Sequence, residues 1–221
     1  MSDPAPRAQA GWLAAIAEKG WRRAAPADAA RLSGLTEADI RTHADDRIDA
    51  LVALQDRVAA EAAAGAAEAG GSVRDRLFDG LIRGFDAAQD SRAVVLAIRA
   101  SRDPAVLLLL SGRGGLHVRR LAQAAGVDVH GLRGQLRLAG LTALVAQAFA
   151  AWRADDSADM SATMAELDRL LERAERAYTE GLSPDLLGLP GLSSLLSRLP
   201  WQRGSADRAP PPPIQRYNGA A

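Results

Sequence analysis

The sequence predicts an all-helical protein that begins with a helix-turn-helix. The chain is rich in alanine, leucine, arginine and glutamate and has few β-branched runs, a composition that favours helices. Apolar residues recur at helical spacing along most of the chain. Helix start and stop signals are concentrated between residues 18 and 51. These three observations together predict the fold class.

The start and stop signals define two short helices and the turn between them. Pro26 suits the first turn of a helix, where its missing N–H would have no partner. Gly34 stands where a helix commonly ends in a left-handed residue. Thr36 can cap the next helix, with Asp39 three residues later in a weak capping box. Two helices joined by a short glycine-containing turn form a helix-turn-helix.

Two segments give this motif a family resemblance. Residues 18–21 read EKGW, an acidic-basic-Gly-aromatic corner, and residues 30–36 read ARLSGLT. In spacing and residue type they resemble the amino-terminal domain of TetR-type transcriptional regulators. The resemblance implies a TetR-type fold, with a three-helix DNA-binding head and a helical ligand-binding and dimerisation domain. It also implies a non-enzymatic homodimer that binds double-stranded DNA and a small molecule.

The expected recognition helix departs from the family pattern. Where TetR-type proteins usually have Lys-Gly-Thr-Leu-Tyr-x-Tyr-Phe, residues 37–44 read EADIRTHA. Residues 18–51 contain six basic and seven acidic side chains, and the whole chain is neutral, which argues against strong non-specific DNA binding. The alternative is a solvated surface of mixed charge, with Glu37 and Asp39 stabilising the helix dipole. The candidate DNA contacts are Arg22, Arg23, Thr36, Arg41, Thr42, His43 and Arg47.

Helical spacing predicts the remaining organisation of the chain. The run 105–110 is apolar all round, so we expect it to be buried, and we expect the glycine-rich segment 111–115 to break the helix after it. Two long helices should follow, over about 129–153 and 157–180. The expected domains are a head (1–50), a ligand-binding and dimerisation domain (51–180), an amphipathic helix (181–202) and a disordered Pro-rich tail (203–221).

Apolar residues in the second domain are candidates for a ligand pocket. A solid core would use the same side chains, but the TetR resemblance favours a cavity, and the lack of charge on these faces predicts an apolar or lipid-like ligand. We expect the two long helices to form the dimer interface because Leu136, Leu144 and Leu170 lie off their main apolar stripes. The candidate pocket residues are Phe78, Leu81, Phe85, Leu108, Leu109, Leu121 and Trp152.

The carboxy-terminal part supports an alternative function. Residues 155–159, DDSAD, and 167–169, LDR, resemble a turn and helix of the lipid-binding accessory protein of coenzyme Q biosynthesis. That resemblance implies a lipid-binding protein without DNA binding that contacts membranes through a helix near its carboxyl end. An apolar stripe in that region would dock on the protein itself or meet a membrane. Its residues are Leu192, Leu195, Leu196, Leu199 and Trp201.

Other kinds of site find little support in the sequence. The chain has no cysteine, and its three histidines lie far apart without metal-ligand spacing. The segment 111–115, SGRGG, lacks the Gly-Lys-Ser/Thr end of a phosphate-binding loop. We therefore expect no cofactor, no metal and no enzymatic activity. The first residues lack the apolar core of a signal peptide, so we expect a cytoplasmic protein.

Overall fold

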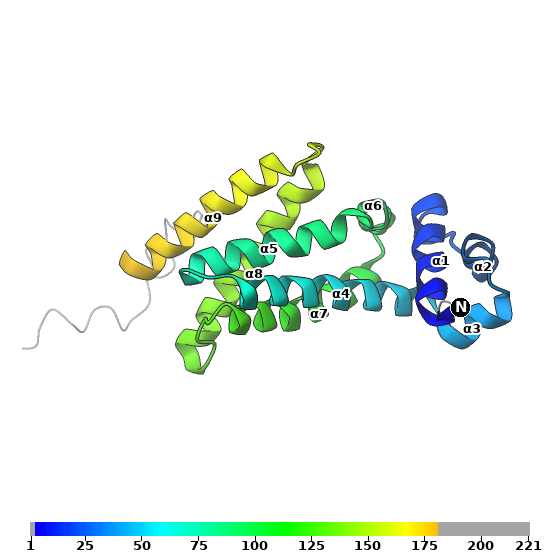
Figure 1. Ribbon diagram of the computed structural model, residues 1–221, viewed down its shortest axis with the longest axis horizontal. Helices are drawn as coiled ribbons and strands as arrows, with labels where there is room; N and C mark the ends of the chain where they lie inside the picture. The colour runs from blue at the N-terminus through cyan, green and yellow to red at the C-terminus, as the bar shows by residue number, and fades with distance from the viewer. Residues whose placement is uncertain (1–2, 181–221) are drawn as a thin grey trace, which may run out of the picture. The chain divides into compact units, whose positions relative to one another are not determined.

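Helices make up the secondary structure of residues 3–180, the part of the chain that the computed structural model describes (Figure 1). No strand occurs among these residues, so the prediction of an all-α fold is confirmed. The nine helices are α1 (Pro4–Lys19), α2 (Pro26–Ser33), α3 (Glu37–His43), α4 (Arg47–Glu68), α5 (Val73–Gln89), α6 (Arg92–Ser101), α7 (Pro104–Ala124), α8 (Gly131–Ala154) and α9 (Ser161–Glu180).

The helix-turn-helix forms as the start and stop signals predict. Helix α2 begins at Pro26 and ends before Gly34, whose φ of 66° is left-handed. Thr36 caps α3: its hydroxyl accepts a hydrogen bond from the Asp39 amide at 3.1 Å, and the Asp39 carboxylate accepts one from the Thr36 amide at 3.0 Å. This reciprocal pair is a capping box.

The head helices share one apolar core with the start of the body. Trp12, Ile16 and Ile40 are buried at its centre, and the Trp12 indole N–H donates to the Ala44 carbonyl at 2.9 Å. The same core takes in apolar side chains from the first half of α4, from α6 and from the start of α7. We call it the head core.

A second core lies farther along α4 and includes buried apolar side chains of α4, α5, α7, α8 and α9. We call it the body core. Helices α4 and α5 approach closely there because a Cβ at Gly80 would lie 2.7 Å from the Ala62 carbonyl oxygen. Only glycine fits at such a crossing. Of the described residues, 3–175 form one compact unit that includes both cores.

Helix α7 differs from the prediction in two ways. It runs without a break from Pro104 to Ala124, so the segment 111–115 does not interrupt it. Its apolar start is not buried all round either: Val106 is 4% exposed, whereas Leu108 is 75% exposed. Only one side of this helix faces the head core, and the apolar run is long enough to continue onto the other side.

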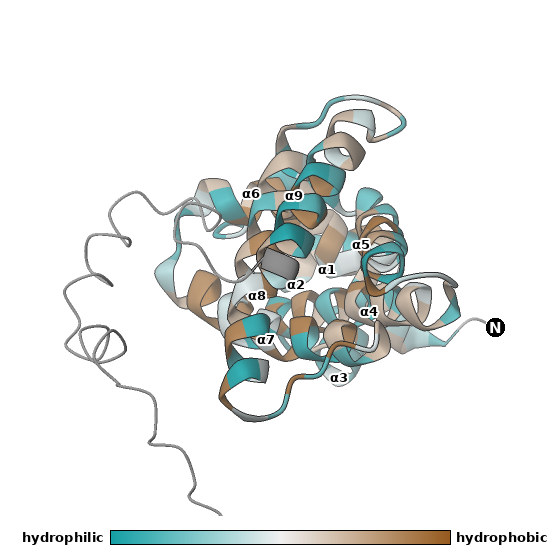
Figure 2. Cartoon of the chain, turned by 90° about the vertical axis from the view of Figure 1, so that its left-hand side faces the viewer, coloured by the Kyte–Doolittle hydropathy of each residue, from teal (hydrophilic) through white to brown (hydrophobic). Residues whose placement is uncertain are grey.

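The dimer prediction rested on leucines of the last two helices that were expected to face outward, and most of these leucines are buried. Leu144 and Leu170 are buried in the chain's own core, at 6% and 4% exposure, and only Leu136, at 53%, faces outward. Helix α9 lies towards the viewer in Figure 2, where its residues are largely hydrophilic. The predicted amphipathic helix and Pro-rich tail (181–221) lie outside the described residues. Within residues 3–180, no helix has the length and apolarity that crossing a membrane requires.

Candidate nucleic-acid interface

The turn between α2 and α3 is held in place by α1. Arg7 of α1 donates from Nη2 to the carbonyls of Ser33 and Gly34, at 2.8 and 3.3 Å. These contacts satisfy carbonyls at the end of α2 that have no partner within the helix. Sequence patterns could not predict this role, because Arg7 lies 26 residues before Ser33. The position of α3 therefore depends on α1 as well as on the turn.

The outer face of α3 carries three of the candidate DNA contacts, Arg41, Thr42 and His43, all of them exposed. The Arg41 guanidinium donates to the Glu37 carboxylate at 2.9 Å, one helical turn earlier. The Thr42 hydroxyl donates to the Ala38 carbonyl at 2.9 Å. Two of these three side chains therefore make their hydrogen bonds within α3.

Two other head cations, Lys19 and Arg31, also have acidic partners. Lys19 pairs with Asp28, and Arg31 donates to both carboxylate oxygens of Glu18 at 3.0 Å. The pKa of Asp28 lies below its ordinary value, mainly because Lys19 donates a hydrogen bond to its carboxylate. Asp28 and Glu18 thus place a carboxylate directly beside each of these two cations.

Two further candidate contacts have structural roles in the head. The Arg47 guanidinium lies over the Trp21 ring, 4.6 Å from its centroid, and donates to the Ala24 carbonyl at 3.4 Å. Thr36 caps α3, and its hydroxyl lowers the pKa of Asp39 by hydrogen bonding. Both side chains help to hold the helix-turn-helix together.

Arg22 and Arg23 lie in the turn between α1 and α2 and are both exposed. Among the described residues, neither guanidinium has a hydrogen bond or an ion pair. Within the described part of the head, these two arginines at the turn make no hydrogen bond, whereas the arginine on α3 is paired with a carboxylate.

A hydrogen bond joins this part of the head to the body. The Trp21 indole N–H donates to Asp103 Oδ2 at 3.2 Å. The other carboxylate oxygen of Asp103 caps α7 by accepting from the Ala105 amide at 3.1 Å. The Asp103 side chain thus links Trp21, just after α1, to the start of α7.

The candidate pocket residues divide into two groups. Five of them belong to the body core, where Leu81, Phe85, Leu121 and Trp152 are buried and Phe78 packs against them. The other two, Leu108 and Leu109, lie outside this core, and Leu108 is on the surface. The five residues that do meet come from α5, α7 and α8.

Aromatic side chains gather in the body core. Phe85 and Phe149 both stack on Trp152, with ring centroids 5.9 and 5.6 Å from its own. Phe78 packs against the same core, so all three phenylalanines of the chain lie in or against it. An open hollow adjoins Phe78, but its other lining residues are charged: Arg74, Asp75, Asp79 and Asp168.

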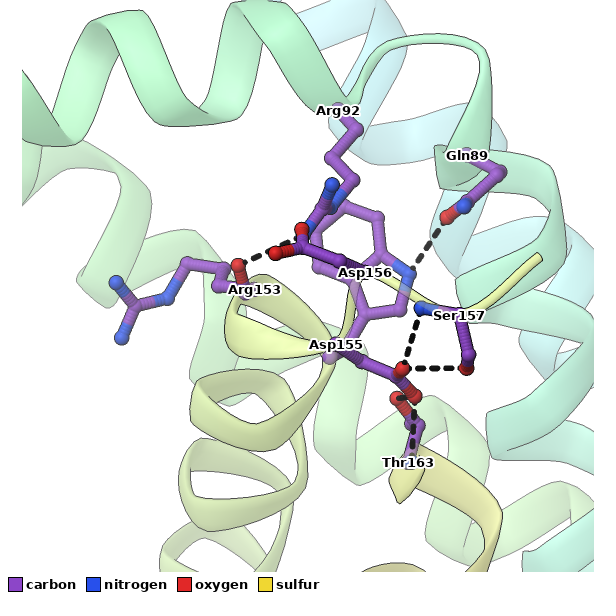
Figure 3. Close-up of polar contacts among 8 residues, drawn as sticks. Gln89, Arg92, Arg153, Asp155, Asp156, Ser157 and Thr163 are labelled. Carbon is purple, nitrogen blue, oxygen red and sulfur yellow. Dashed lines mark hydrogen bonds and ion pairs between the residues drawn. The ribbon is translucent and has the colours of Figure 1, made fainter. Parts of the chain in front are cut away.

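The connection between α8 and α9 is built around a buried carboxylate (Figure 3). Asp155 is 7% exposed and accepts hydrogen bonds from the amides of Ser157 and Thr163, at 3.0 and 2.7 Å, and from both hydroxyls. The pKa of Asp155 lies well below its ordinary value, mainly because the Ser157 hydroxyl donates a hydrogen bond to the carboxylate. The DDSAD segment therefore has a structural role in starting α9.

A second polar cluster lies between α4 and α7. Arg113 Nη2 donates to both oxygens of Asp56, at 2.6 and 2.8 Å, and His117 Nε2 lies 3.3 Å from Asp56 Oδ1. Burial lowers the pKa of His117, while Asp56 opposes that shift. Among the described residues, no group of histidine, aspartate and glutamate side chains is arranged to hold a metal ion.

The comparisons with known proteins identify the fold. No protein-family model matches the sequence, and no curated protein matches it. A TetR transcriptional regulator from Nitrosomonas europaea is similar in structure, with a TM-score of 0.65 and 20% identity over 78% of this chain and 99% of its own. A TetR transcriptional regulator from Rhodococcus sp. RHA1 has a TM-score of 0.56 and 16% identity over 77% of this chain and 94% of its own.

Proposed function

We propose, from the TetR-type fold that these helices share, that the protein is a one-component transcriptional regulator. In this proposal a homodimer binds double-stranded DNA through its heads, and an apolar ligand in the body changes that binding. The observation that carries the proposal is a complete helix-turn-helix whose second helix presents Arg41, Thr42 and His43 outward.

The charge distribution suggests how such a head would contact DNA. Arg22 and Arg23 would meet phosphates, because they are exposed and unpaired and phosphate contacts fix a protein's position on a duplex. Arg41 would have to leave Glu37 to reach a base edge in the major groove. We therefore infer weak general affinity for DNA and a dependence on sequence that comes from α3.

The body core is the proposed ligand site. Its stacked aromatic side chains, Phe85, Phe149 and Trp152, would suit an apolar molecule that inserts among them. A shift of α7 would reach the head through the hydrogen bond between Asp103 and Trp21 and through the α6 side chains in the head core. The lipid-binding alternative is not favoured, since both similar structures are transcriptional regulators.

Titration of labelled DNA from immediately upstream of the protein's own gene tests the proposal. Fluorescence anisotropy at low salt should show saturable binding that an unrelated duplex of the same length does not match. With so few free cations per head, log affinity should fall with log salt at a slope of only about four to six for a dimer. Absence of binding at micromolar protein, for the wild type and for Glu37→Lys alike, would contradict DNA binding.

A further inference from the structure

Helix α7 contains three glycines, Gly112, Gly114 and Gly115, that have no evident packing role. A Cβ at any of them would meet no heavy atom within 4 Å, leaving aside its own neighbourhood in the helix. None of them has a positive φ. Neither a close approach nor a left-handed backbone explains the choice of glycine there. Each one makes the local helix about fivefold less favourable than alanine would.

The glycines lie where α7 passes from one core to the other. Before them, Val106 and Leu110 pack in or against the head core. After them, Val118 and Leu121 are buried in the body core. Residues 111–117 belong to neither core. The weakest part of the helix therefore coincides with the stretch that has no core packing.

Helix α4 holds this stretch from the side. The Gln55 amide donates to the Leu110 carbonyl at 3.0 Å, just before the glycines. Asp56 accepts hydrogen bonds from Arg113, between the glycines, and lies 3.3 Å from His117, just after them. We call these contacts the α4 clamp.

The α4 clamp leaves several polar atoms without hydrogen bonds. The Gln55 carbonyl oxygen and both ring nitrogens of His117 are buried without a hydrogen-bond partner among the described residues. Buried polar atoms without partners are costly. A bend that brought these atoms to water or to other partners would therefore recover part of that cost.

We propose that Gly112–Gly115 form a hinge in α7, which the α4 clamp holds straight. Bending at the hinge would move the first half of α7, together with α6 and the head to which Trp21 and Asp103 join it, relative to the body core. Helix α4 crosses the same boundary without a glycine until Gly65, so it would follow by a gentle bend. The proposal concerns motion within one chain and does not depend on DNA binding.

Distance distributions between two spin labels test the hinge directly. The chain has no cysteine, so Ala27→Cys on α2 and Asp86→Cys on α5, both exposed positions, would give one label on each side of the boundary. Labelled protein diluted with an excess of unlabelled protein removes distances between copies. The wild-type distribution should be broad, and the variant Gly112→Ala/Gly114→Ala/Gly115→Ala should narrow it, because three alanines stiffen the helix.

Matched variants separate the hinge from a general gain in stability. Gly140→Ala adds the same methyl group at a helical glycine of α8, where nothing lies within 4 Å of the new Cβ, and should leave the distribution unchanged. Asp56→Asn weakens the α4 clamp and should broaden it. Hydrogen exchange of the amides in 112–117 should slow at least tenfold in the triple variant. Equal distribution widths in the wild type, the triple variant and Asp56→Asn would overturn the proposal, even if exchange slowed.

Discussion

Arg41 lies one helical turn after Glu37 on α3, and its guanidinium donates to the Glu37 carboxylate at 2.9 Å. Both side chains are about half exposed, so the pair is worth little for stability. Its consequence concerns binding, because the arginine on the outer face of the expected recognition helix is already neutralised. DNA would have to displace a carboxylate to reach it.

Replacing Glu37 by Gln should therefore strengthen DNA binding by the proposed head. The change frees Arg41 and removes a negative charge from the face that would approach phosphates. Anisotropy titrations at one fixed low salt concentration would measure the effect. Glu18→Gln is the matched control: it frees Arg31 on α2, which is not a candidate contact, and should change affinity less. Equal gains in DNA affinity for both variants would mean that the loss of any negative charge on the head strengthens binding, and not the release of Arg41 on α3.

The two unpaired arginines should act differently from Arg41. Arg22→Ala should weaken binding to specific and unrelated DNA alike, since a phosphate contact carries no sequence information. In a dimer it should also reduce the salt slope by about two. Arg41→Ala should reduce binding to the specific duplex alone. Titrations of both duplexes at several salt concentrations measure both quantities, and a purely specific loss in Arg22→Ala would contradict the assignment to phosphate.

Core substitutions should separate the two groups of candidate pocket residues. Leu121 is 4% exposed in the body core. Replacing it by Ala should lower the free energy of unfolding by about 2–5 kcal/mol. Leu108→Ala, at a position 75% exposed, should change it by less than about 0.5 kcal/mol. Urea denaturation followed by Trp fluorescence measures both variants. A large cost at Leu108 would mean that another molecule covers this face in solution.

The buried carboxylate of Asp155 predicts a dependence of stability on pH. Because hydrogen bonds to the ionised form lower its pKa in the folded protein, the unfolded chain takes up a proton at higher pH than the folded chain does. The stabilisation is present above the unfolded pKa of about 3.9 and is lost as pH falls through the folded value. Asp155→Asn should therefore be less stable than the wild type at pH 7.

The difference in stability between wild type and Asp155→Asn should shrink on acidification from pH 5 towards pH 3, as denaturation at several pH values would show. Asp156→Asn provides the control, since this neighbouring carboxylate is 91% exposed and pairs with Arg92 at the surface. It should change stability little at any pH. A difference for Asp155→Asn that stays constant from pH 7 to pH 3 would rule out a charged Asp155 as the stabilising group.

The proposed homodimer should depend on the exposed side of α8. Leu132 and Leu136 are 79% and 53% exposed there, and no charged residue occurs from Leu138 to Trp152. Leu136→Asp should shift the protein to monomer in light scattering at micromolar concentration, because a buried unpaired carboxylate is costly. Val73→Asp, at an exposed apolar position on α5, should not. A monomeric wild type would refute the dimer itself.

Local chemistry made the head predictable from sequence. Pro26, Gly34 and Thr36 act through their own backbone positions and through neighbours a few residues away, so their spacing was enough to place α2, the turn and α3. The all-helical class followed in the same way from composition and apolar spacing. The family resemblance extended these observations to a fold that two solved structures share.

Contacts between distant segments decided the rest. Helix α7 continues through three glycines, where local preference favours a break, and contacts from Gln55 and Asp56 of α4 hold it there. Leu108 and Val106 belong to the same apolar run, but only the position of the head core determines which of them is buried. The sequence placed Arg41 on the outer face of α3, whereas the folded side chains decided that its charge is paired while those of Arg22 and Arg23 are not. Capping and helical periodicity involve residues within one or two turns of each other, so sequence specifies them directly. Burial and pairing depend on which helices meet, and only the tertiary structure brings those helices together.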